Sequence, residues 1–506
     1  MSLPEIADEI PFHLQILNNS VLYGNDKALS DVNGCIHYTD LRPLSNRYAN
    51  ALRVFGIKRG DNVLIVFSNR NEYPLVFLGA ALLGATISGA SPQLTRDEID
   101  HLCKEANSKL VIVEENVEYF QETGEIKILN INEFLSIVNE ASSNPSEIEN
   151  SASLDDVLIE PFSSGTTGLP KCVQLTHRNY ISATKSLSEA LFSKLSLTKG
   201  RRCTLAFLPF YHGSGFWALV YCLLAGHHSV IQNEFHPLIM MKAIEEHKVD
   251  VINVVPSIVS ALLRLPIDSF NLSSLSLVLV GSAPLGRELS EAFMNKFPQV
   301  KHLIQGYGMS EVVVLSHLTP LEADSEQWGS CGRLLPGSQG KLIDDDGNEV
   351  KEDGQWGELF LKSEAVFKGY KGGQESGKDK EGWLRTGDIA YKDLRDFYFI
   401  VDRKKDLIKV NGLQVAPAQL EEVLLTHPNI AEAVVVRTEH PQYGEVPKAF
   451  IIAAEGMTID PKEIQDYVKE RVAPFKQLRG GIVLCNELPK TKSGKIAKSK
   501  LQDYQF

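Results

Sequence analysis

Apolar runs rich in β-branched residues alternate with amphipathic stretches from Tyr38 to about Leu318. The runs predict buried strands, and the stretches, with apolar residues three or four positions apart, predict helices. The predicted strands are 63–67, 110–113, 251–255 (stopped by Pro256), 277–280 and 300–304, and the predicted helices are 97–106 (capped by Thr95 or Asp97), 236–247 and 286–297. This alternation predicts an α/β fold of doubly wound parallel sheets. Ligands of such sheets bind beyond the carboxyl ends of the strands, where Gly281 and Gln305-Gly306 fall.

The pattern changes twice after this region. From Gly329 to Asp402 short alternating strands with turn signals at 345–348 and 352–354 predict a small β-barrel or sheet. After Arg403 the chain predicts a small α+β module, with helices at 417–426 and 461–472 and strands at 433–436 and 449–453. We therefore place a domain boundary at Asp402/Arg403, with a large domain 1–402 and a small domain 403–506. The Ser/Asn/Glu-rich stretch 139–156 predicts a surface loop that takes no part in chemistry.

Composition narrows the class of protein. A chain of 506 residues exceeds the size at which a single hydrophobic core keeps growing, and 43% of its residues are hydrophobic. At least two domains are therefore expected. A net charge of −13 argues against nucleic-acid binding, which relies on clustered Lys and Arg. The 7 cysteines form no Cys-x-x-Cys pair, so they give neither a zinc signature nor a disulfide framework and predict buried thiols in a reducing compartment.

No targeting signal is expected at either terminus. Residues 1–12 contain acids in place of a basic run before a long apolar stretch, so no signal peptide is expected. The most apolar stretch, 216–225, is too short to span a bilayer and predicts a core helix. The chain ends without Ser-Lys-Leu, and the cytosol is the expected compartment.

The run 163–171 concentrates residues suited to phosphate. Glycines let backbone N–H groups approach an anion, hydroxyls add donors that rotate, and a lysine adds mobile positive charge. The run reads Ser163-Ser164-Gly165-Thr166-Thr167-Gly168-Leu169-Pro170-Lys171. It is not the common nucleotide loop, because Leu169 and Pro170 separate Gly168 from the lysine and Cys172 follows it. A polyphosphate ligand is expected, although a plain surface turn can have the same composition.

This run resembles the phosphate loop of the adenylate-forming superfamily, which includes acyl-CoA synthetases, 4-coumarate:CoA ligases, beetle luciferases and adenylation domains of peptide synthetases. Further runs match that superfamily in order and cover nearly the whole chain. They are Gln305-Gly306-Tyr307-Gly308-Met309-Ser310-Glu311, Arg385-Thr386-Gly387-Asp388, Asp402-Arg403-Lys404-Lys405-Asp406 with Lys409 and Gly412, and Pro489-Lys490-Thr491-Lys492-Ser493-Gly494-Lys495-Ile496. Their joint occurrence is far more specific than any one of them.

The resemblance implies a nucleotide site. Attaching AMP to a carboxylate makes its oxygen a good leaving group, and the attack joins two anions, so cations and oriented donors must neutralise charge. Lys495 is the implied catalytic lysine, Glu311 the implied Mg²⁺ ligand, Tyr307 the partner of adenine and Asp388 the acceptor for the ribose hydroxyls. The implied nucleotide-binding residues are Ser163, Ser164, Gly165, Thr166, Thr167, Gly168, Lys171, Gly306, Tyr307, Gly308, Ser310 (mostly Thr in the family), Asp388 and Arg403. Taken alone, Lys495 would be an exposed lysine of a basic tail.

The resemblance also implies an acyl site and a moving domain. His212 matches a residue at the mouth of the acyl pocket, although a histidine in an apolar run is more often part of a core. The implied lining residues are His212, Ser214, Phe216, Trp217, Gly281, Gly306 and Val312. For the second half-reaction the small domain would rotate about a hinge at 402–405. Lys409 would then serve thioester formation and Gly412 would lie beside CoA. Cys172 departs from the family's usual glycine, a change we expect the site to tolerate.

These residues together predict an ATP-dependent acid–CoA ligase that uses ATP, Mg²⁺ and CoA. The acid, aromatic or of medium to long chain length, and the oligomeric state stay open. An enzyme that loads a separate carrier protein and a luciferase-like oxygenase are alternatives with the same motifs. A non-catalytic nucleotide- or acyl-binding regulator would be expected to lack Lys495, Glu311 or Asp388, and all three are present.

Overall fold

A computed structural model describes residues 5–114, 126–144, 152–163, 170–195, 202–373, 377–411, 413–489 and 496–502. The chain divides into two compact units, residues 1–339 with 361–384, and residues 340–360 with 385–506. The boundary predicted at Asp402/Arg403 from the change in sequence pattern stays a prediction. Among the described residues, no helix has the length and apolarity needed to cross a bilayer.

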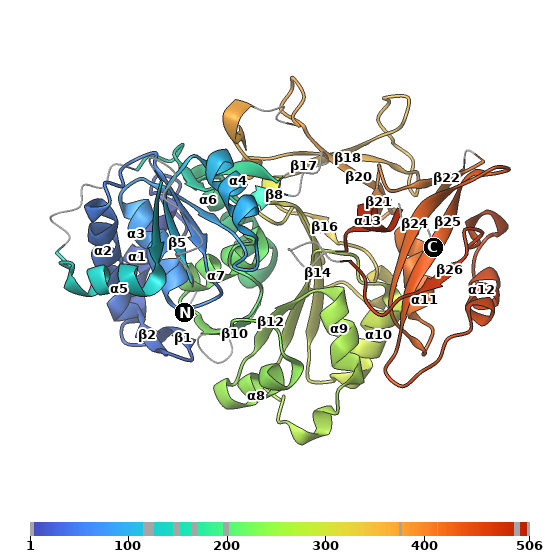
Figure 1. Cartoon of the computed structure of the whole chain (residues 1–506), viewed down its shortest axis with the longest axis horizontal. Coiled ribbons are helices and arrows are strands. Elements are labelled where there is room, and N and C mark those ends of the chain that lie inside the picture. The colour runs from blue at the N-terminus through green and yellow to red at the C-terminus, as the bar shows by residue number, and fades with distance from the viewer. Residues whose placement is uncertain are drawn as a thin grey trace. The chain divides into compact units, whose positions relative to one another are not determined.

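The first unit contains two large sheets with helices packed on them (Figure 1). In the described residues the larger sheet has the order β16-β15-β14-β13-β12-β10-β11-β1-β2. Its central pairs from β14 to β1 are parallel. The strands are β1 (Lys27–Asp31), β2 (Gly34–His37), β10 (Cys203–Ala206), β11 (His228–Ile231), β12 (Val251–Val254), β13 (Leu277–Val280), β14 (His302–Tyr307), β15 (His317–Leu318) and β16 (Arg333–Leu334).

The second sheet has the order β19-β9-β7-β4-β3-β5-β6, with β8 paired to β9. Its central strand β3 is buried at every position, which explains its continuous apolar run. The strands are β3 (Asn62–Val66), β4 (Thr86–Gly89), β5 (Ser108–Val113), β6 (Lys127–Asn130), β7 (Val157–Ile159), β8 (Phe162–Ser163), β9 (Lys171–Thr176) and β19 (Gly369–Tyr370). The predicted doubly wound α/β fold is therefore confirmed for this unit.

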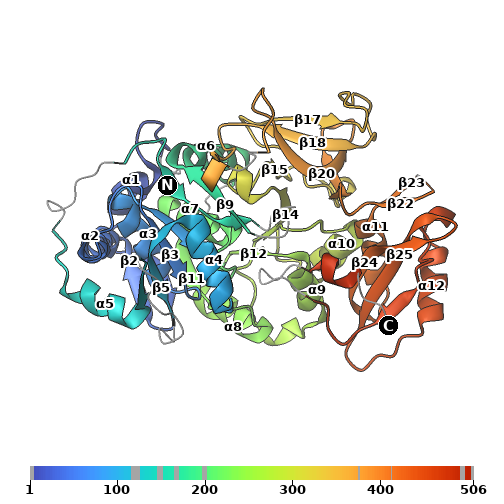
Figure 2. The ribbon, with the colours of Figure 1, turned by 45° about the horizontal axis from the view of Figure 1, so that its top comes forward.

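Several helices of the first unit begin at recognisable caps. A capping box of Thr95 and Glu98 starts α4, Thr176 caps α6, and a proline opens α8 and α9. The helices are α1 (Phe12–Tyr23), α2 (Tyr38–Val54), α3 (Glu72–Leu82), α4 (Arg96–Ala106), α5 (Ile131–Glu140), α6 (His177–Leu187), α7 (Gly213–Ala225), α8 (Pro237–His247), α9 (Pro256–Arg264) and α10 (Arg287–Lys296). Figure 2 shows α1 among α2, α3 and α7, and α1 also packs on α6, so this helix joins layers that belong to both sheets.

The second unit contains two smaller sheets. The four-stranded sheet β17-β18-β20-β21 is open. The segment predicted as a small β-barrel or sheet therefore forms a sheet. The other sheet carries α11 on β24 and α12 beside α11. The elements are β17 (Gln339–Ile343), β18 (Gly357–Lys362), β20 (Leu384–Lys392), β21 (Tyr398–Arg403), β22 (Ile408–Val410), β23 (Leu413–Val415), α11 (Pro417–Leu425), β24 (Ile430–His440), β25 (Gly444–Ala453), α12 (Pro461–Lys469), β26 (Ile482–Leu484) and α13 (Lys498–Gln502).

Several details differ from the sequence prediction, among them the helix predicted at 461–472, which ends at Lys469, and the strand predicted at 433–436, which runs from Ile430 to His440. Pro256 does not merely stop β12; it is the first residue of α9, a position where proline's missing N–H costs nothing. The strand predicted at 300–304 starts two residues later and continues to Tyr307. The expectation that the cysteines are buried is wrong for Cys35, which is exposed near the β1–β2 turn, whereas Cys103, Cys172, Cys222 and Cys331 are buried.

Candidate active site

The predicted phosphate loop starts and ends at one point of the second sheet. Ser163 at the end of β8 lies directly opposite Lys171 at the start of β9 in an antiparallel pair. The Ser163 hydroxyl is buried, with no hydrogen-bond partner among the described residues. Buried hydroxyls normally have a partner, so this one is suited to a ligand atom or a neighbouring loop group. The predicted ligands Ser164, Gly165, Thr166, Thr167 and Gly168 lie outside the described residues.

Tyr370 connects the loop lysine to the predicted metal ligand. Its hydroxyl donates a hydrogen bond to Glu311 Oε1 across 2.8 Å. The Lys171 Nζ lies 5.1 Å from the centroid of its ring, within range of a cation–π contact. Glu311 is only 4% exposed, so its carboxylate depends on such donors. The structure thus brings together two residues that are 140 positions apart in the chain.

A buried carboxylate supports the base of the loop. Glu160, 1% exposed, lies just before β8. It accepts hydrogen bonds from Asn62 at 2.8 Å and Gln174 at 3.0 Å and forms an ion pair with Lys371 at 2.9 Å. Cys172 is also buried here, and burial, together with the negative charge of Glu160, raises the pKa of its thiol well above the usual range. Cys172 is therefore a neutral packing residue beside the loop lysine.

Strained backbone follows β14. A Cβ on Gly308 would lie 1.8 Å from the carbonyl oxygen of Val314, so only glycine fits there. Val313 and Val314 have φ angles of 48° and 79°, a left-handed conformation that β-branched residues rarely adopt. Between these positions the short 3₁₀ turn Ser310–Val312 holds the predicted ligands Ser310 and Glu311. Strain of this kind is typical of ligand-binding segments, where the surrounding structure maintains it.

The start of α7 lies against this turn. His212 is the N-cap residue of α7. A Cβ on Gly213 would lie 3.9 Å from the Ser310 hydroxyl. Gly281, directly after β13, faces the carbonyl oxygen of Gly306, which would be 3.8 Å from an added Cβ. The structure therefore groups these glycines and the α7 terminus near the predicted nucleotide turn.

Of the other predicted acyl-site residues, Phe216, Trp217 and Val312 are buried. Phe216 is fully buried, with its ring 4.9 Å from that of Phe77, so it belongs to the core. Trp217 is 7% exposed and lies beside Tyr221, with ring centroids 5.4 Å apart. Val312 is 2% exposed. Ser214, in the first turn of α7, and Tyr307, whose ring lies 5.6 Å from that of His317, are partly exposed.

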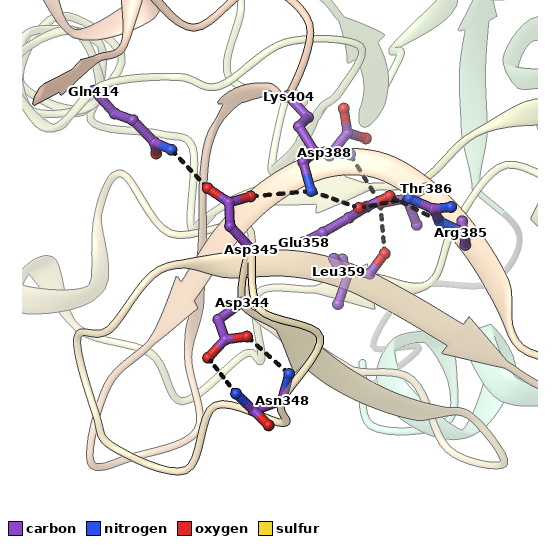
Figure 3. Close-up of polar contacts among 10 residues, drawn as sticks. All are labelled: Asp344, Asp345, Asn348, Glu358, Leu359, Arg385, Thr386, Asp388, Lys404 and Gln414. Carbon is purple, nitrogen blue, oxygen red and sulfur yellow. Dashed lines mark hydrogen bonds and ion pairs between the residues drawn. The ribbon is translucent and has the colours of Figure 1, made fainter. Parts of the chain in front are cut away.

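The second unit holds the predicted ribose ligands. Arg403 at the end of β21 forms an ion pair with Asp388 of β20 across 2.8 Å. The backbone N–H of Asp388 donates to the Thr386 hydroxyl, which in turn donates to the carbonyl oxygen of Leu359 (Figure 3). These bonds fix the turn that presents Asp388.

An ionic network lies beside this turn. Glu358 accepts hydrogen bonds from Arg385 and lies 3.2 Å from Lys404, and Lys404 also lies 3.2 Å from Asp345 (Figure 3). Gln414 donates to the same Asp345 carboxylate. The network joins residues before and after the predicted hinge at 402–405.

The remaining predicted residues are separated or not described. Lys409 is exposed on β22, and its backbone N–H donates to Glu445. Gly412 and Lys495 lie outside the described residues. Sequence reasoning missed Tyr370, Lys371 and Glu160. A carboxylate directly after the apolar run 157–159 is the signal that could have found Glu160, whereas the short strand at Tyr370 carries no comparable signal.

The donor set near Glu311 fits Mg²⁺. Mg²⁺ is usually held by one or two carboxylates together with substrate phosphates. Among the described residues, no group of three or more His, Cys, Asp or Glu side chains could form a complete metal cage. A buried carboxylate such as that of Glu311 near a phosphate loop is the arrangement that a Mg²⁺–nucleotide complex commonly uses.

Comparisons with known proteins agree with this geometry. The family model for AMP-binding enzymes matches residues 19–371, and that for the AMP-binding enzyme C-terminal domain matches residues 419–495. The chain is 34% identical to 4-coumarate–CoA ligase 1 of Petroselinum crispum, covering 99% of this chain and 95% of that protein. It is 33% identical, with the same coverage, to the 4-coumarate–CoA ligase of Vanilla planifolia.

A solved structure extends the likeness to the fold. The o-succinylbenzoate CoA synthetase of Bacillus subtilis, in complex with its acyl-adenylate intermediate, has a TM-score of 0.86 and 27% identity, covering 98% of this chain and 99% of that one. The chain therefore belongs to the AMP-binding enzyme family of the adenylate-forming superfamily. It is an AMP-forming acid–CoA ligase, which uses ATP and CoA and proceeds through an acyl-adenylate.

Proposed function

We propose that this ligase activates a planar aromatic acid of the hydroxycinnamate kind. The names of the relatives from Petroselinum crispum and Vanilla planifolia, both 4-coumarate–CoA ligases, support this substrate class. A second support is Gly281, because among the described residues, its chain neighbours aside, only the Gly306 carbonyl oxygen lies within 4 Å of a Cβ placed there. This space leaves room for a flat ring beside Gly281, whereas a Cβ on Gly306 would lie 2.7 Å from the Leu315 side chain.

The observation that carries the nucleotide half of the proposal is the connection of Lys171 and Glu311 through Tyr370. Lys171 is proposed to neutralise the phosphates of ATP, and Glu311 to hold Mg²⁺. When bound, Mg²⁺ would offset negative charge on the phosphates. Ser163, Ser310 and the loop residues 164–168 are proposed to donate hydrogen bonds to the same group.

The acid's carboxylate attacks the α-phosphate, pyrophosphate leaves, and a thiol then attacks the acyl carbon and releases AMP. Lys495 is proposed to neutralise the two anions in the first step and Lys409 to serve the second. Asp388 and Arg403 are proposed to hold the ribose, Tyr307 to lie against adenine and Gly412 to lie beside the acceptor. His212, Ser214, Trp217 and Val312 are proposed to border the acyl group.

The test is AMP release by the purified chain with Mg-ATP and a panel of hydroxycinnamates, benzoates and fatty acids, with and without CoA. Strong CoA-dependent AMP formation with hydroxycinnamates supports the proposal. Preference for a fatty acid would overturn the aromatic assignment. Pyrophosphate release that CoA leaves unchanged would instead favour a carrier protein as acceptor.

A further inference from the structure

We propose that Tyr370 is a positioning residue for the nucleotide site, which aligns the Glu311 carboxylate through its hydroxyl and Lys171 through its ring. This inference rests on the proposed roles of Glu311 toward Mg²⁺ and of Lys171 toward phosphate. It adds a residue outside every motif that identified the family.

The placement of Tyr370 is fixed by the backbone. The two-residue strand β19 (Gly369–Tyr370) pairs antiparallel with β9, so that Tyr370 lies opposite Val173. Lys171 is at the start of the same β9 strand. Because ladder pairing fixes register, the backbone positions of Tyr370 and Lys171 are fixed relative to each other, which keeps the ring within reach of the lysine.

The same segment holds Glu311 by two contacts. The Phe367 N–H donates to the backbone carbonyl of Glu311 at 2.8 Å, and the Tyr370 hydroxyl donates to its carboxylate at 2.8 Å. The Phe367 ring meets the Tyr370 ring edge-on at 4.9 Å, which limits ring motion. Backbone and side chain of Glu311 are thus both tied to segment 367–370.

The next residue anchors the segment from the other side. Lys371 pairs with the buried Glu160 at 2.9 Å and donates to the carbonyl oxygen of Ala106 at the end of α4. A cation is favourable at a helix C-terminus, and the buried carboxylate needs it. Tyr370 is therefore held firmly enough to set the direction of a carboxylate and a lysine.

Two contacts of different chemistry allow a sharp test. Tyr370→Phe removes the hydroxyl that bonds to Glu311 and keeps the ring, whereas Tyr370→Leu also removes the ring beneath Lys171. The measurement is equilibrium binding of α,β-methylene-ATP by calorimetry, with Mg²⁺ and with EDTA. Tyr391→Phe is the matched control, because the Tyr391 ring stacks on Phe399 within the four-stranded sheet.

Tyr370→Phe is expected to reduce the Mg²⁺-dependent gain in affinity about three- to tenfold and to leave binding in EDTA unchanged. Tyr370→Leu is expected to weaken binding in EDTA about two- to fivefold as well. The double variant Tyr370→Phe with Glu311→Gln should lose little more of the Mg²⁺-dependent gain in affinity than Glu311→Gln alone, since both changes act on one carboxylate. Tyr370→Phe should lower the melting temperature slightly, because the buried Glu311 carboxylate loses a donor, whereas the control should melt as the unmodified chain does.

An unchanged Mg²⁺-dependent gain in Tyr370→Phe, together with its loss in Glu311→Gln, would overturn the role of Tyr370 and leave that of Glu311 intact. An unchanged gain in Glu311→Gln would instead overturn the proposed metal role itself. An equal loss in Mg²⁺ and EDTA with a lowered melting temperature would show that Tyr370 is a packing residue only.

Discussion

Arg403 Nε lies 2.8 Å from Asp388 Oδ1, so the two predicted ribose ligands hold each other. The Asp388 side chain is 5% exposed and that of Arg403 42% exposed. An ionised carboxylate has acceptor sites only, and enough of them for an arginine and two hydroxyls together. The pair therefore aligns an acceptor before any nucleotide binds, which reduces the cost of ordering it.

Asp388→Asn tests this alignment. The amide keeps the size but turns one acceptor into a donor and removes the charge, so binding of ATP should weaken about ten- to a hundredfold. Discrimination against 2′-deoxy-ATP and 3′-deoxy-ATP should fall at the same time, because the lost contacts are those to the hydroxyls. Calorimetric titration with the three nucleotides measures both effects.

The control for Asp388→Asn is Asp396→Asn, a change at an exposed acid of the β20–β21 turn that pairs with Lys392. It should bind all three nucleotides as the unmodified chain does. Equal weakening for ATP and both deoxy analogues in Asp388→Asn would remove the ribose assignment.

Motifs and periodicity predicted the fold well, because strands such as β13 and helices such as α4 carry their own signals of burial and capping. They also predicted Lys171 and Glu311. They could not predict what joins these two residues, since the contact runs through Tyr370 of the two-residue strand β19, whose pairing depends on the whole sheet. The apolar run did predict a core helix at 216–225, but it could not show that the Phe216 ring packs against Phe77, because that contact depends on another helix.

Lys495→Ala and Lys409→Ala test the assignment of the two half-reactions. In Lys495→Ala the loss of one charge-stabilising donor should slow adenylate formation by about two to three orders of magnitude. The same variant should still transfer preformed acyl-AMP to CoA. Lys409→Ala should slow the transfer of preformed acyl-AMP to CoA and leave adenylate formation unchanged.

Rapid-quench assays of pyrophosphate release and of thioester formation separate the two steps. Lys462→Ala, a change at an exposed lysine in the first turn of α12, serves as the control because it lies outside the predicted hinge and both predicted reactive positions. Equal damage to both half-reactions by either Lys495→Ala or Lys409→Ala would contradict the rotating-domain assignment.

Lys371→Met should destabilise the chain about 3–5 kcal/mol, because it leaves the buried Glu160 carboxylate without its cation. The Lys371 side chain is 22% exposed and that of Glu160 only 1%. Urea unfolding followed by circular dichroism measures the loss. Adding Glu160→Gln to Lys371→Met should recover part of the stability, since the buried charge is then gone.

The matched control for this ion pair is Arg59→Met, which breaks an equally short pair with Asp156 at 2.9 Å. The Arg59 side chain is 49% exposed, so water replaces the lost partner and the cost should stay below about 1 kcal/mol. Similar losses for Lys371→Met and Arg59→Met would mean that the Glu160 pair contributes no more than a surface pair.

Acid should destabilise the chain through His177. Burial lowers the pKa of His177 to about 4, although the Asp156 carboxylate favours its charged form. Its Nδ1 accepts a hydrogen bond from the Phe12 N–H, which requires that nitrogen to be unprotonated. Since the unfolded histidine titrates near 6.5, only the unfolded state takes up the proton between about pH 6.5 and 4. The free energy of unfolding should therefore fall by about 3 kcal/mol as the pH drops through this window, and stay constant above it.

His177→Gln removes one of the buried titrating groups and should make this part of the pH profile less steep, whatever it does to stability at pH 7.5. His13, His228 and His317, whose pKa values burial also lowers, still contribute to the slope. Urea midpoints at pH 7.5, 6.0 and 5.0 give the slope for each protein. His247→Gln is the control, because His247 is exposed in the last turn of α8 and gains no comparable burial on folding. A slope in His177→Gln equal to that of the unmodified chain would assign the acid sensitivity to other groups, foremost the neighbouring His13, whose pKa burial also lowers.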